Sequence, residues 1–204
     1  MIENHKIRTY GRLKGKGTIN SYNNHLDDYT FKIEELPEKD LYLEIGFGTG
    51  DFILHKAQCD KDITFIGCEV YQNGINKLIN CMRKEDIKNI KIWPNDARDL
   101  LENLKNSSIK VAWILFPDPW PKKRHNKRRL INYEFLSLLK TKIAFDGKLF
   151  IATDIIDYAE SIKESNKNLF IIDENNFEND YIKTSYHNKA STDINYLTLT
   201  HNNT

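Results

Sequence analysis

Apolar residues are distributed in two alternating patterns from Leu41 onward. Short runs rich in Leu, Ile, Val and Phe are typical of buried strands, and the stretches between them repeat apolar residues every three or four positions, as amphipathic helices do. The expected strands are 41–46, 63–70, 89–93, 111–116, 147–154, 168–173 and 194–201, and the expected helices are 51–59, 71–86, 97–104, 131–143 and 156–166. This alternation predicts an α/β fold with a doubly wound, mainly parallel, seven-stranded sheet.

The N-terminal region lacks either pattern, which predicts a basic arm over residues 1–36 and a single domain over 37–204. Residues 1–17 carry five Lys or Arg and one acid, and residues 121–129 carry six Lys or Arg and no acid. Because the net charge of the whole chain is only +1, the remainder must be acidic. Two basic segments on an acidic body favour contact with a nucleic acid over two unrelated solvated surfaces.

The apolar runs fall well short of the roughly 18–20 residues that a membrane span needs. The basic N-terminus lacks the apolar core of a signal peptide. Cys59, Cys68 and Cys81 are odd in number and show no metal-ligand spacing. We therefore expect reduced thiols, no bound metal, no membrane association and a cytoplasmic protein. No obligatory protein partner is evident, so we expect a monomer or a homodimer.

Three glycines, Gly46, Gly48 and Gly50, fall in the first turn from strand to helix, where an open α/β sheet binds its ligands. A dinucleotide fingerprint needs G-x-G-x-x-G, whereas this turn reads G-x-G-x-G, with Glu44 before it and Asp51 directly after it. Carboxylates in these places would repel a pyrophosphate, but they suit a cationic cofactor without phosphate. S-adenosylmethionine, with its sulfonium and α-amino groups, fits that description.

Further acids follow the next two expected strands. Glu69 can accept both ribose hydroxyl protons, and Asp96 can accept from the adenine amino group beside the backbone amide of Ala97. Each acid also has a structural interpretation, Glu69 as an acid at a helix N-terminus and Asp96 as the N-cap of helix 97–104. The glycine turn alone is a weak signal, and its combination with acids after three successive strands is stronger.

Residues 116–121 read FPDPWP and follow the apolar run that begins at Val111. Each proline restricts its own φ and pushes the preceding residue toward extended geometry. We therefore expect Phe116, Asp118 and Trp120 to be extended, and the turn that carries Asp118 to be stiff. A stiff acidic and aromatic turn followed by a basic run predicts a site for a polyanionic substrate.

Asp118-Pro119-Trp120 resembles the Asp/Asn-Pro-Pro-aromatic loop of methyltransferases that act on adenine and cytosine amines. The longer string FPDPWPKKRHNKRR (116–129) is similar to the signature of bacterial tRNA (guanine-N7)-methyltransferases. That resemblance covers nearly the whole chain and includes the segments IRTYGRLKGKG, LEIGFGTG, IGCEV, NDA, LFIATD and TSYHNKA.

This resemblance implies a class I, Rossmann-like methyltransferase that transfers a methyl group from S-adenosylmethionine to N7 of the variable-loop guanine of tRNA. It implies that Asp118 is the catalytic residue. The cofactor-binding residues that it implies are Glu44, Gly46, Gly48, Glu69, Asp96, Ala97 and Asp118. The substrate-binding residues that it implies are Lys122, Asp154, Thr184, Tyr186 and His187, the last standing where the family pattern has Glu.

Guanine N7 carries a free lone pair, so no proton has to leave before it attacks the methyl carbon. We therefore expect Asp118 to orient the base and stabilise the developing positive charge rather than to act as a general base. Trp120 has two equal interpretations, as a stacking partner of the base or as a cover over the turn. The six cations of 121–129 are expected to meet phosphates, with some of them facing acids of the protein. His125 can donate to a phosphate or pack beneath the turn, and the structural interpretation is favoured.

Three other functions remain open from the residues: methylation of an exocyclic base amine, RNA binding without catalysis, and a dinucleotide-dependent dehydrogenase. The glycine spacing and Glu44 disfavour the dehydrogenase.

Overall fold

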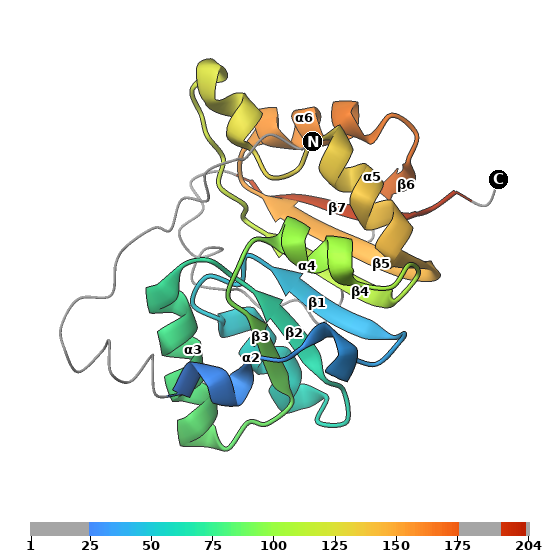
Figure 1. The fold of residues 1–204 in the computed structure, drawn as a ribbon. Helices are drawn as coiled ribbons and strands as arrows, with labels where there is room; N and C mark the ends of the chain where they lie inside the picture. Colours follow the sequence, from blue (N-terminus) through green and yellow to red (C-terminus); the bar gives the residue numbers. More distant parts are fainter. Residues whose placement is uncertain (1–24, 176–192, 203–204) are drawn as a thin grey trace.

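The computed structural model describes residues 25–175 and 193–202 (Figure 1). A seven-stranded sheet forms its centre, in the order β3-β2-β1-β4-β5-β7-β6. The strands are β1 (Leu41–Ile45), β2 (Phe65–Cys68), β3 (Ile90–Trp93), β4 (Ile109–Leu115), β5 (Ile143–Thr153), β6 (Phe170–Asp173) and β7 (Asn195–His201). The helices are α2 (Asp51–Cys59), α3 (Gln72–Glu85), α4 (Ala97–Asn103), α5 (Tyr133–Lys142) and α6 (Ile156–Asn166), with 3₁₀ helices η1 (Ile33–Glu35) and η2 (Lys123–Arg128).

The pairing of the strands confirms the predicted doubly wound, mainly parallel sheet. β1 pairs in parallel with β2 on one side and with β4 on the other, and the parallel pairing continues to β3 and β5. β7 runs antiparallel to both β5 and β6. The direction of strand order therefore reverses between β1 and β4, which is where folds of this type bind ligands.

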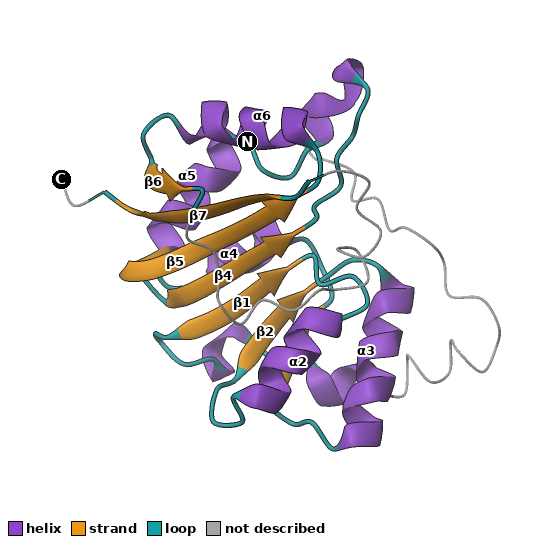
Figure 2. Cartoon of the chain, turned by 180° about the vertical axis from the view of Figure 1, so that it is seen from behind, coloured by secondary structure: helices purple, strands orange, loops and turns teal. Residues whose placement is uncertain are grey.

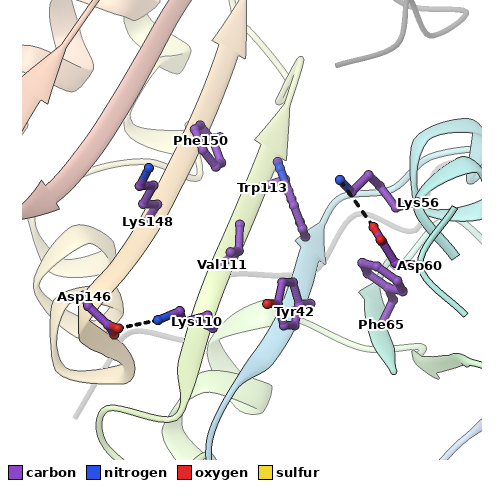
Figure 3. A pocket seen from close by; sticks show the side chains of 10 residues that line it. All are labelled: Tyr42, Lys56, Asp60, Phe65, Lys110, Val111, Trp113, Asp146, Lys148 and Phe150. Carbon is purple, nitrogen blue, oxygen red and sulfur yellow. Dashed lines mark hydrogen bonds and ion pairs between the residues drawn. The ribbon is translucent and has the colours of Figure 1, made fainter. Parts of the chain in front are cut away.

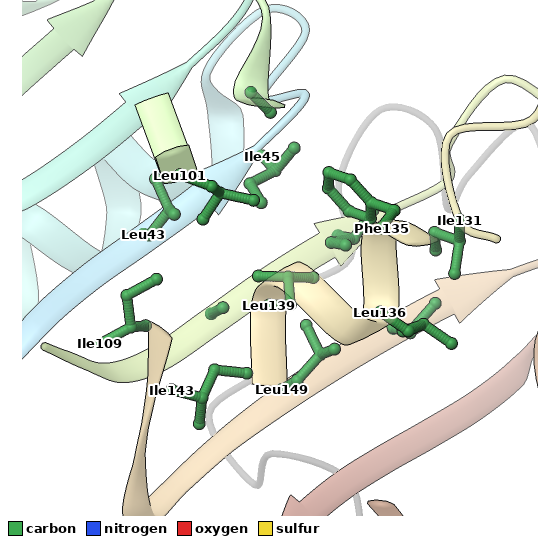
Figure 4. Close-up of a cluster of buried hydrophobic side chains, with 14 of the residues drawn as sticks. Leu43, Ile45, Leu101, Ile109, Ile131, Phe135, Leu136, Leu139, Ile143 and Leu149 are labelled. Atoms are coloured by element: carbon green, nitrogen blue, oxygen red, sulfur yellow. The ribbon is translucent and has the colours of Figure 1, made fainter. Parts of the chain in front are cut away.

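Helices cover the sheet on both faces, and each face has its own apolar core (Figure 2). On one face, α4, α5 and α6 pack on side chains such as Leu43, Ile114 and Ile151 (Figure 4). On the other face, α2 and α3 pack around Trp113 and Phe65. Burial on both faces explains why the parallel strands read as continuous apolar runs rather than as alternating ones.

Most element boundaries agree with the expected ones within two or three residues, and β5 is the main exception. It begins at Ile143, directly after α5 and four residues before the expected start, because Ile143 pairs with Ile109 at the beginning of β4. The expected strand 63–70 is also shorter, since only Phe65–Cys68 pairs with its neighbours.

Part of the expected basic arm lies within the described residues. Residues 25–29 are helical, and Leu26 and Tyr29 pack against the core beneath α2 and α3. Phe31 and Leu36 pack against the core of the other face. The remainder of the arm lies outside the described residues, and the boundary at residue 36 stays a prediction.

Candidate active site

Five acids lie at the carboxyl ends of the five parallel strands at the centre of the fold. Glu44 is the fourth residue of β1, and the others follow β2, β3, β4 and β5: Glu69, Asp96, Asp118 and Asp154. Because the carboxyl ends of parallel strands meet at one edge of a sheet, the fold brings all five sequence-predicted acids to the same edge.

The glycine turn adopts a backbone that other residues rarely adopt. Gly46, Gly48 and Gly50 have φ values of +76°, +57° and +80°. Gly50 also lacks room for a side chain, since a Cβ there would lie 2.7 Å from a methyl group of Leu78. The turn is thus shaped by both left-handed backbone and close packing, and it leads directly into α2.

Glu44 is buried at this turn, with 3% of its surface exposed. Its Oε2 atom has no hydrogen-bond partner among the described residues. The pKa of this carboxyl is raised to about 8, mainly by burial and in part by the nearby charges of Glu69 and Asp51, while a backbone N–H of Ile53 acts in the opposite direction. A buried acceptor without a donor is costly, so this atom is well suited to a cationic ligand group. Glu44 lines a small pocket that also includes Gly46.

Glu69 ties the glycine turn to the start of α3. Its Oε2 accepts from the Gly48 N–H at 2.7 Å, and its Oε1 accepts from the N–H groups of Val70 and Tyr71 at 2.7 and 2.9 Å. Burial raises the pKa of Glu69, and the charge of Asp118 contributes in the same direction. The Glu69 carboxylate therefore holds the glycine turn against the start of α3.

Asp96 is the N-cap of α4, as its structural interpretation predicts. Its Oδ1 accepts from the Arg98 N–H at 2.8 Å, and its Oδ2 pairs with the Arg98 guanidinium at 3.2 Å. Ala97 is the first residue of α4 and is buried. The structure thus shows a capping role for Asp96 and leaves its contact with adenine as a prediction.

The turn that carries Asp118 differs from the sequence expectation. Phe116 and Trp120 have φ values of +53° and +43°, so the prediction that they are extended is wrong. The Phe116 N–H donates to the Ala152 carbonyl at 2.8 Å, so the start of the turn is bonded to β5. Left-handed backbone costs an ordinary residue about 1–2 kcal/mol, so the surrounding structure must hold this turn in place.

Asp118 itself is solvent-exposed in part. Partial burial raises the pKa of its carboxyl. Its charge also contributes to the raised pKa values of Glu69 and Tyr158.

Trp120 is packed within its own segment. The Arg128 guanidinium lies 5.0 Å from the centre of its ring, and the His125 ring meets it edge-on at 5.9 Å. Hydrogen bonding assigns the Asn126 amide nitrogen as a donor to the Trp120 carbonyl, at 3.1 Å. These contacts favour Trp120 as a cover over the turn, and they agree with the structural interpretation of His125.

The basic run forms η2, which projects from the body of the molecule beside α6 (Figures 1 and 2). Its exposed cations are Lys122, Lys123, Arg124, Lys127 and Arg128. Arg129 does not belong with them. Its side chain is 2% exposed and pairs with Asp157, which confirms the expectation that some of the six cations face acids of the protein.

Of the five residues predicted to contact RNA, the structure describes two. Lys122 caps η2, and Asp154 lies one residue beyond β5. Thr184, Tyr186 and His187 lie outside the described residues. The strands on either side of them, β6 and β7, end and begin at the edge of the sheet that carries Asp154, because Asn195 pairs with Thr153.

Two features of the site were missed from the sequence. Gly74 in α3 packs directly against the glycine turn, since a Cβ there would lie 1.9 Å from the Gly48 carbonyl oxygen. A glycine inside an amphipathic helix was the available signal. The second is Arg129, which donates hydrogen bonds to Asp157, 28 residues away, and lies over the Tyr158 ring. Contacts so distant in sequence leave no local signal.

A larger groove, of about 260 Å³, lies away from these residues (Figure 3). It opens toward the amino-terminal halves of the strands, over Tyr42, Val111 and Trp113. Its charged residues pair with each other, Lys56 with Asp60 and Lys110 with Asp146. Ligands of doubly wound folds bind at the opposite edge, so we do not assign this groove to the active site.

No three His, Cys, Asp or Glu side chains in residues 25–175 and 193–202 gather as a metal site would require. Within the same ranges no helix combines the length and the apolar character that crossing a membrane requires. Cys59, Cys68 and Cys81 form no disulfide.

The fold is shared with solved methyltransferases of low sequence identity. The precorrin-6y C5,15-methyltransferase of Geobacter metallireducens superposes with a TM-score of 0.60, at 11% identity, over 98% of this chain and 96% of that one. The tRNA (m1A58) methyltransferase of Aquifex aeolicus superposes with a TM-score of 0.54, at 13% identity, over 97% and 73%.

Comparison of the sequence identifies the family, whereas the structural matches show only the fold. A family described as "Putative methyltransferase" matches residues 38–198. The bifunctional methyltransferase of Rickettsia felis is 36% identical over 195 residues, or 90% of this chain, which spans 37% of that protein's length. The tRNA (guanine-N(7)-)-methyltransferase of Neorickettsia sennetsu is 38% identical over 166 residues, or 80% of this chain and 76% of that protein. The protein of the same name from Wolbachia pipientis wMel is 47% identical over 158 residues, or 76% and 71%. Given these matches and the methyltransferase fold that contains them, the chain belongs to the tRNA (guanine-N(7)-)-methyltransferase family.

Proposed function

We propose that this protein transfers a methyl group from S-adenosylmethionine to N7 of a guanine in tRNA, and that the target is the variable-loop guanine. The observation that carries the proposal is the position of Asp118. It follows β4 at the same edge of the sheet as Glu44 and Glu69, and only a few residues separate it from the exposed cations of η2. This arrangement suits a reaction between a cationic cofactor and a base held on a polyanion.

The residues at the glycine turn fit S-adenosylmethionine. The unpartnered, buried Oε2 of Glu44 would accept from its α-amino group. Glu69 keeps acceptor capacity for ribose hydroxyls beside the three N–H groups that it already binds. Asp96 and Ala97 would bind the adenine end, and Gly46 and Gly48 would let the backbone approach closely. When bound, the cofactor supplies an electrophilic methyl group on a sulfonium.

Asp118 would orient the base and stabilise charge. A carboxylate is only an acceptor, and the N1–H and N2–H₂ groups of guanine are donors, so Asp118 and Asp154 can select guanine by that edge. Positive charge grows on the purine as N7 is methylated, and a fixed carboxylate nearby stabilises it. No proton has to be removed before the attack.

The exposed cations of η2 would bind the phosphate backbone next to the target nucleotide. The family resemblance also assigns Lys122, directly before η2, and Asp154, directly after β5, to RNA binding. Thr184, Tyr186 and His187 complete that assignment. The flanking strands support it, because β7 begins opposite Thr153, next to Asp154.

The test is methylation of an unmodified tRNA transcript with labelled S-adenosylmethionine, followed by chemical cleavage at 7-methylguanine. Cleavage should map to the variable loop, and a transcript with that guanine replaced by adenine should take up no label. Asp118→Ala should lose at least about 100-fold in kcat, the scale for removing one preorganised charge-stabilising group.

Two results would contradict the proposal in different ways. Label in an exocyclic amine would favour the alternative that Asp118-Pro119-Trp120 serves an amine methyltransferase. Binding of tRNA without any binding of S-adenosylmethionine in calorimetry would favour an RNA-binding module without catalysis.

A further inference from the structure

Arg129 connects the loop that carries Asp118 with the start of α6, the helix that follows Asp154. Its Nε donates to the Pro119 carbonyl at 3.0 Å, one residue after Asp118. Its Nη1 donates to the Asp157 carbonyl at 3.3 Å, and its Nη2 pairs with the Asp157 carboxylate. Asp157 lies in the first turn of α6, which follows Asp154 directly.

The guanidinium is enclosed as well as bonded. Its Cζ lies 4.7 Å from the centre of the Tyr158 ring, and Tyr158 is fully buried. The Tyr158 hydroxyl accepts from the Ile131 N–H at 3.1 Å, which fixes the chain just after Arg129. A cation that is 97% buried, stacked on an aromatic ring and bonded to the protein through all three of its nitrogens has little surface left to offer a phosphate.

The hydrogen bond to the Pro119 carbonyl acts on the part of the turn next to Asp118. Pro119 lies between Asp118 and Trp120, in a turn whose ends, Phe116 and Trp120, both have left-handed backbone. Without support, such a turn would relax toward ordinary φ values and carry the Asp118 carboxylate with it.

We propose that Arg129 is a positioning residue for the methyl transfer, which sets the place of Asp118 relative to Asp154, and that it is not an RNA contact although it ends the basic run. The proposal rests on the function proposed above, since it assigns the consequence of the bond to the reaction of Asp118.

The chemistry requires arginine at this position. The planar guanidinium directs Nε to the Pro119 carbonyl and both terminal nitrogens to Asp157 in α6, at fixed angles. A lysine could keep the charge and one of these bonds but not the connection between the loop and α6. Arg129→Lys therefore tests the connection while it keeps the positive charge buried beside Asp157.

The experiment compares Arg129→Lys with Arg124→Ala, which removes an exposed cation of η2. For each protein we would measure kcat and KM for the tRNA transcript, the salt dependence of tRNA binding, and hydrogen–deuterium exchange in 116–121, at the amides of Phe116, Asp118 and Trp120. Arg129→Lys should lower kcat about 10- to 100-fold, because small misplacements of reacting groups have effects of that size. It should speed exchange in 116–121 and leave the salt slope unchanged. Arg124→Ala should act on KM and lower the salt slope by about one.

Asp157→Asn is the second variant, because its side chain is 66% exposed and its loss leaves the carbonyl acceptor in place. It should lower kcat less than Arg129→Lys, and the two changes together should do little more than Arg129→Lys alone. All assays would be run well below each variant's melting temperature.

Two outcomes would overturn the inference: wild-type kcat with a reduced salt slope in Arg129→Lys, or unchanged exchange in 116–121. A wild-type protein that makes no 7-methylguanine would instead contradict the proposed function, and the exchange measurement would still decide whether Arg129 holds the turn.

Discussion

Gly74 in α3 touches the backbone of Gly48 so closely that a Cβ on Gly74 would lie 1.9 Å from the Gly48 carbonyl oxygen. The Gly48 N–H in turn donates to Glu69, which also binds the N-terminus of α3. The helix and the glycine turn are therefore fixed to each other on two sides, by a close approach and by a shared carboxylate.

This contact predicts the effect of Gly74→Ala. Helix propensity alone would favour alanine by up to about 1 kcal/mol in a helix interior. The methyl group has no room, so the glycine turn must shift, and we expect weaker binding of S-adenosylmethionine by about 10-fold or more in calorimetry, an effect of about 1.4 kcal/mol. Lys84→Ala, at an exposed position of the same helix, should bind as the wild type does. Unchanged affinity in Gly74→Ala would show that the turn does not need its present position.

A second prediction concerns the support beneath Arg129. Tyr158→Phe leaves the buried Ile131 N–H without its acceptor, which should lower the free energy of unfolding by about 1–3 kcal/mol. Burial raises the pKa of Tyr158 to about 12, so the phenol stays neutral and the loss should be constant between about pH 6 and 9. Urea denaturation measures it. Tyr133→Phe, at a position that is 40% exposed, should change stability by less than about 0.5 kcal/mol. Equal effects of the two variants would contradict the assigned bond.

A third prediction separates binding from chemistry on η2. Lys123→Ala and Lys127→Ala remove exposed cations, and each should lower the slope of log affinity for tRNA against log salt by about one. Lys84→Ala removes a cation near the end of α3, at the opposite edge of the sheet, and should leave the slope as it is. Filter binding over a salt series gives all three slopes. A slope that is the same in every variant would exclude η2 from the RNA interface.

The elements that the sequence predicts well are those whose signal is local. Strands buried on both faces read as apolar runs, and the acids that follow them can be placed at one edge of the sheet as soon as the strands are known to be parallel. That is why Glu44, Glu69, Asp96, Asp118 and Asp154 could be grouped before their positions were known.

The parts that could not be predicted depend on contacts distant in sequence. The rule for residues before proline fails at Phe116 and Trp120, because the Ala152 carbonyl and the Arg129 guanidinium fix the turn between them. In the sequence, Arg129 cannot be distinguished from the other five cations of 121–129, because its partner Asp157 is 28 residues away. Local composition indicates a basic surface, but it does not indicate which member of the run is buried.

A fourth prediction follows from the burial of Glu44, whose pKa is raised to about 8 from an ordinary value of 4.5. Between these values the folded chain holds a proton that the unfolded chain has released, so this residue lowers stability as pH rises toward 8, by up to about 1.4 kcal/mol per pH unit. Above that range its effect is constant. Glu44→Gln has no proton to lose, so its advantage in unfolding free energy over the wild type should grow with pH through this window. For Glu102→Gln, which replaces an exposed acid of α4, the unfolding free energy should change with pH as it does in the wild type.

The same carboxyl should release a proton when S-adenosylmethionine binds. Near neutral pH Glu44 is mostly protonated in the protein without ligand, and a cationic amino group next to Oε2 favours its charged form. The apparent binding enthalpy should therefore vary with the ionisation enthalpy of the buffer, and affinity should rise with pH between about 6 and 8 by up to tenfold per unit. Titration calorimetry in phosphate and in Tris measures both effects. Glu44→Gln should bind at least about 30-fold more weakly, as expected for truncating one partner of a buried charge pair, and should lose the buffer dependence. An enthalpy that is the same in both buffers for the wild type would mean that the amino group does not meet Glu44.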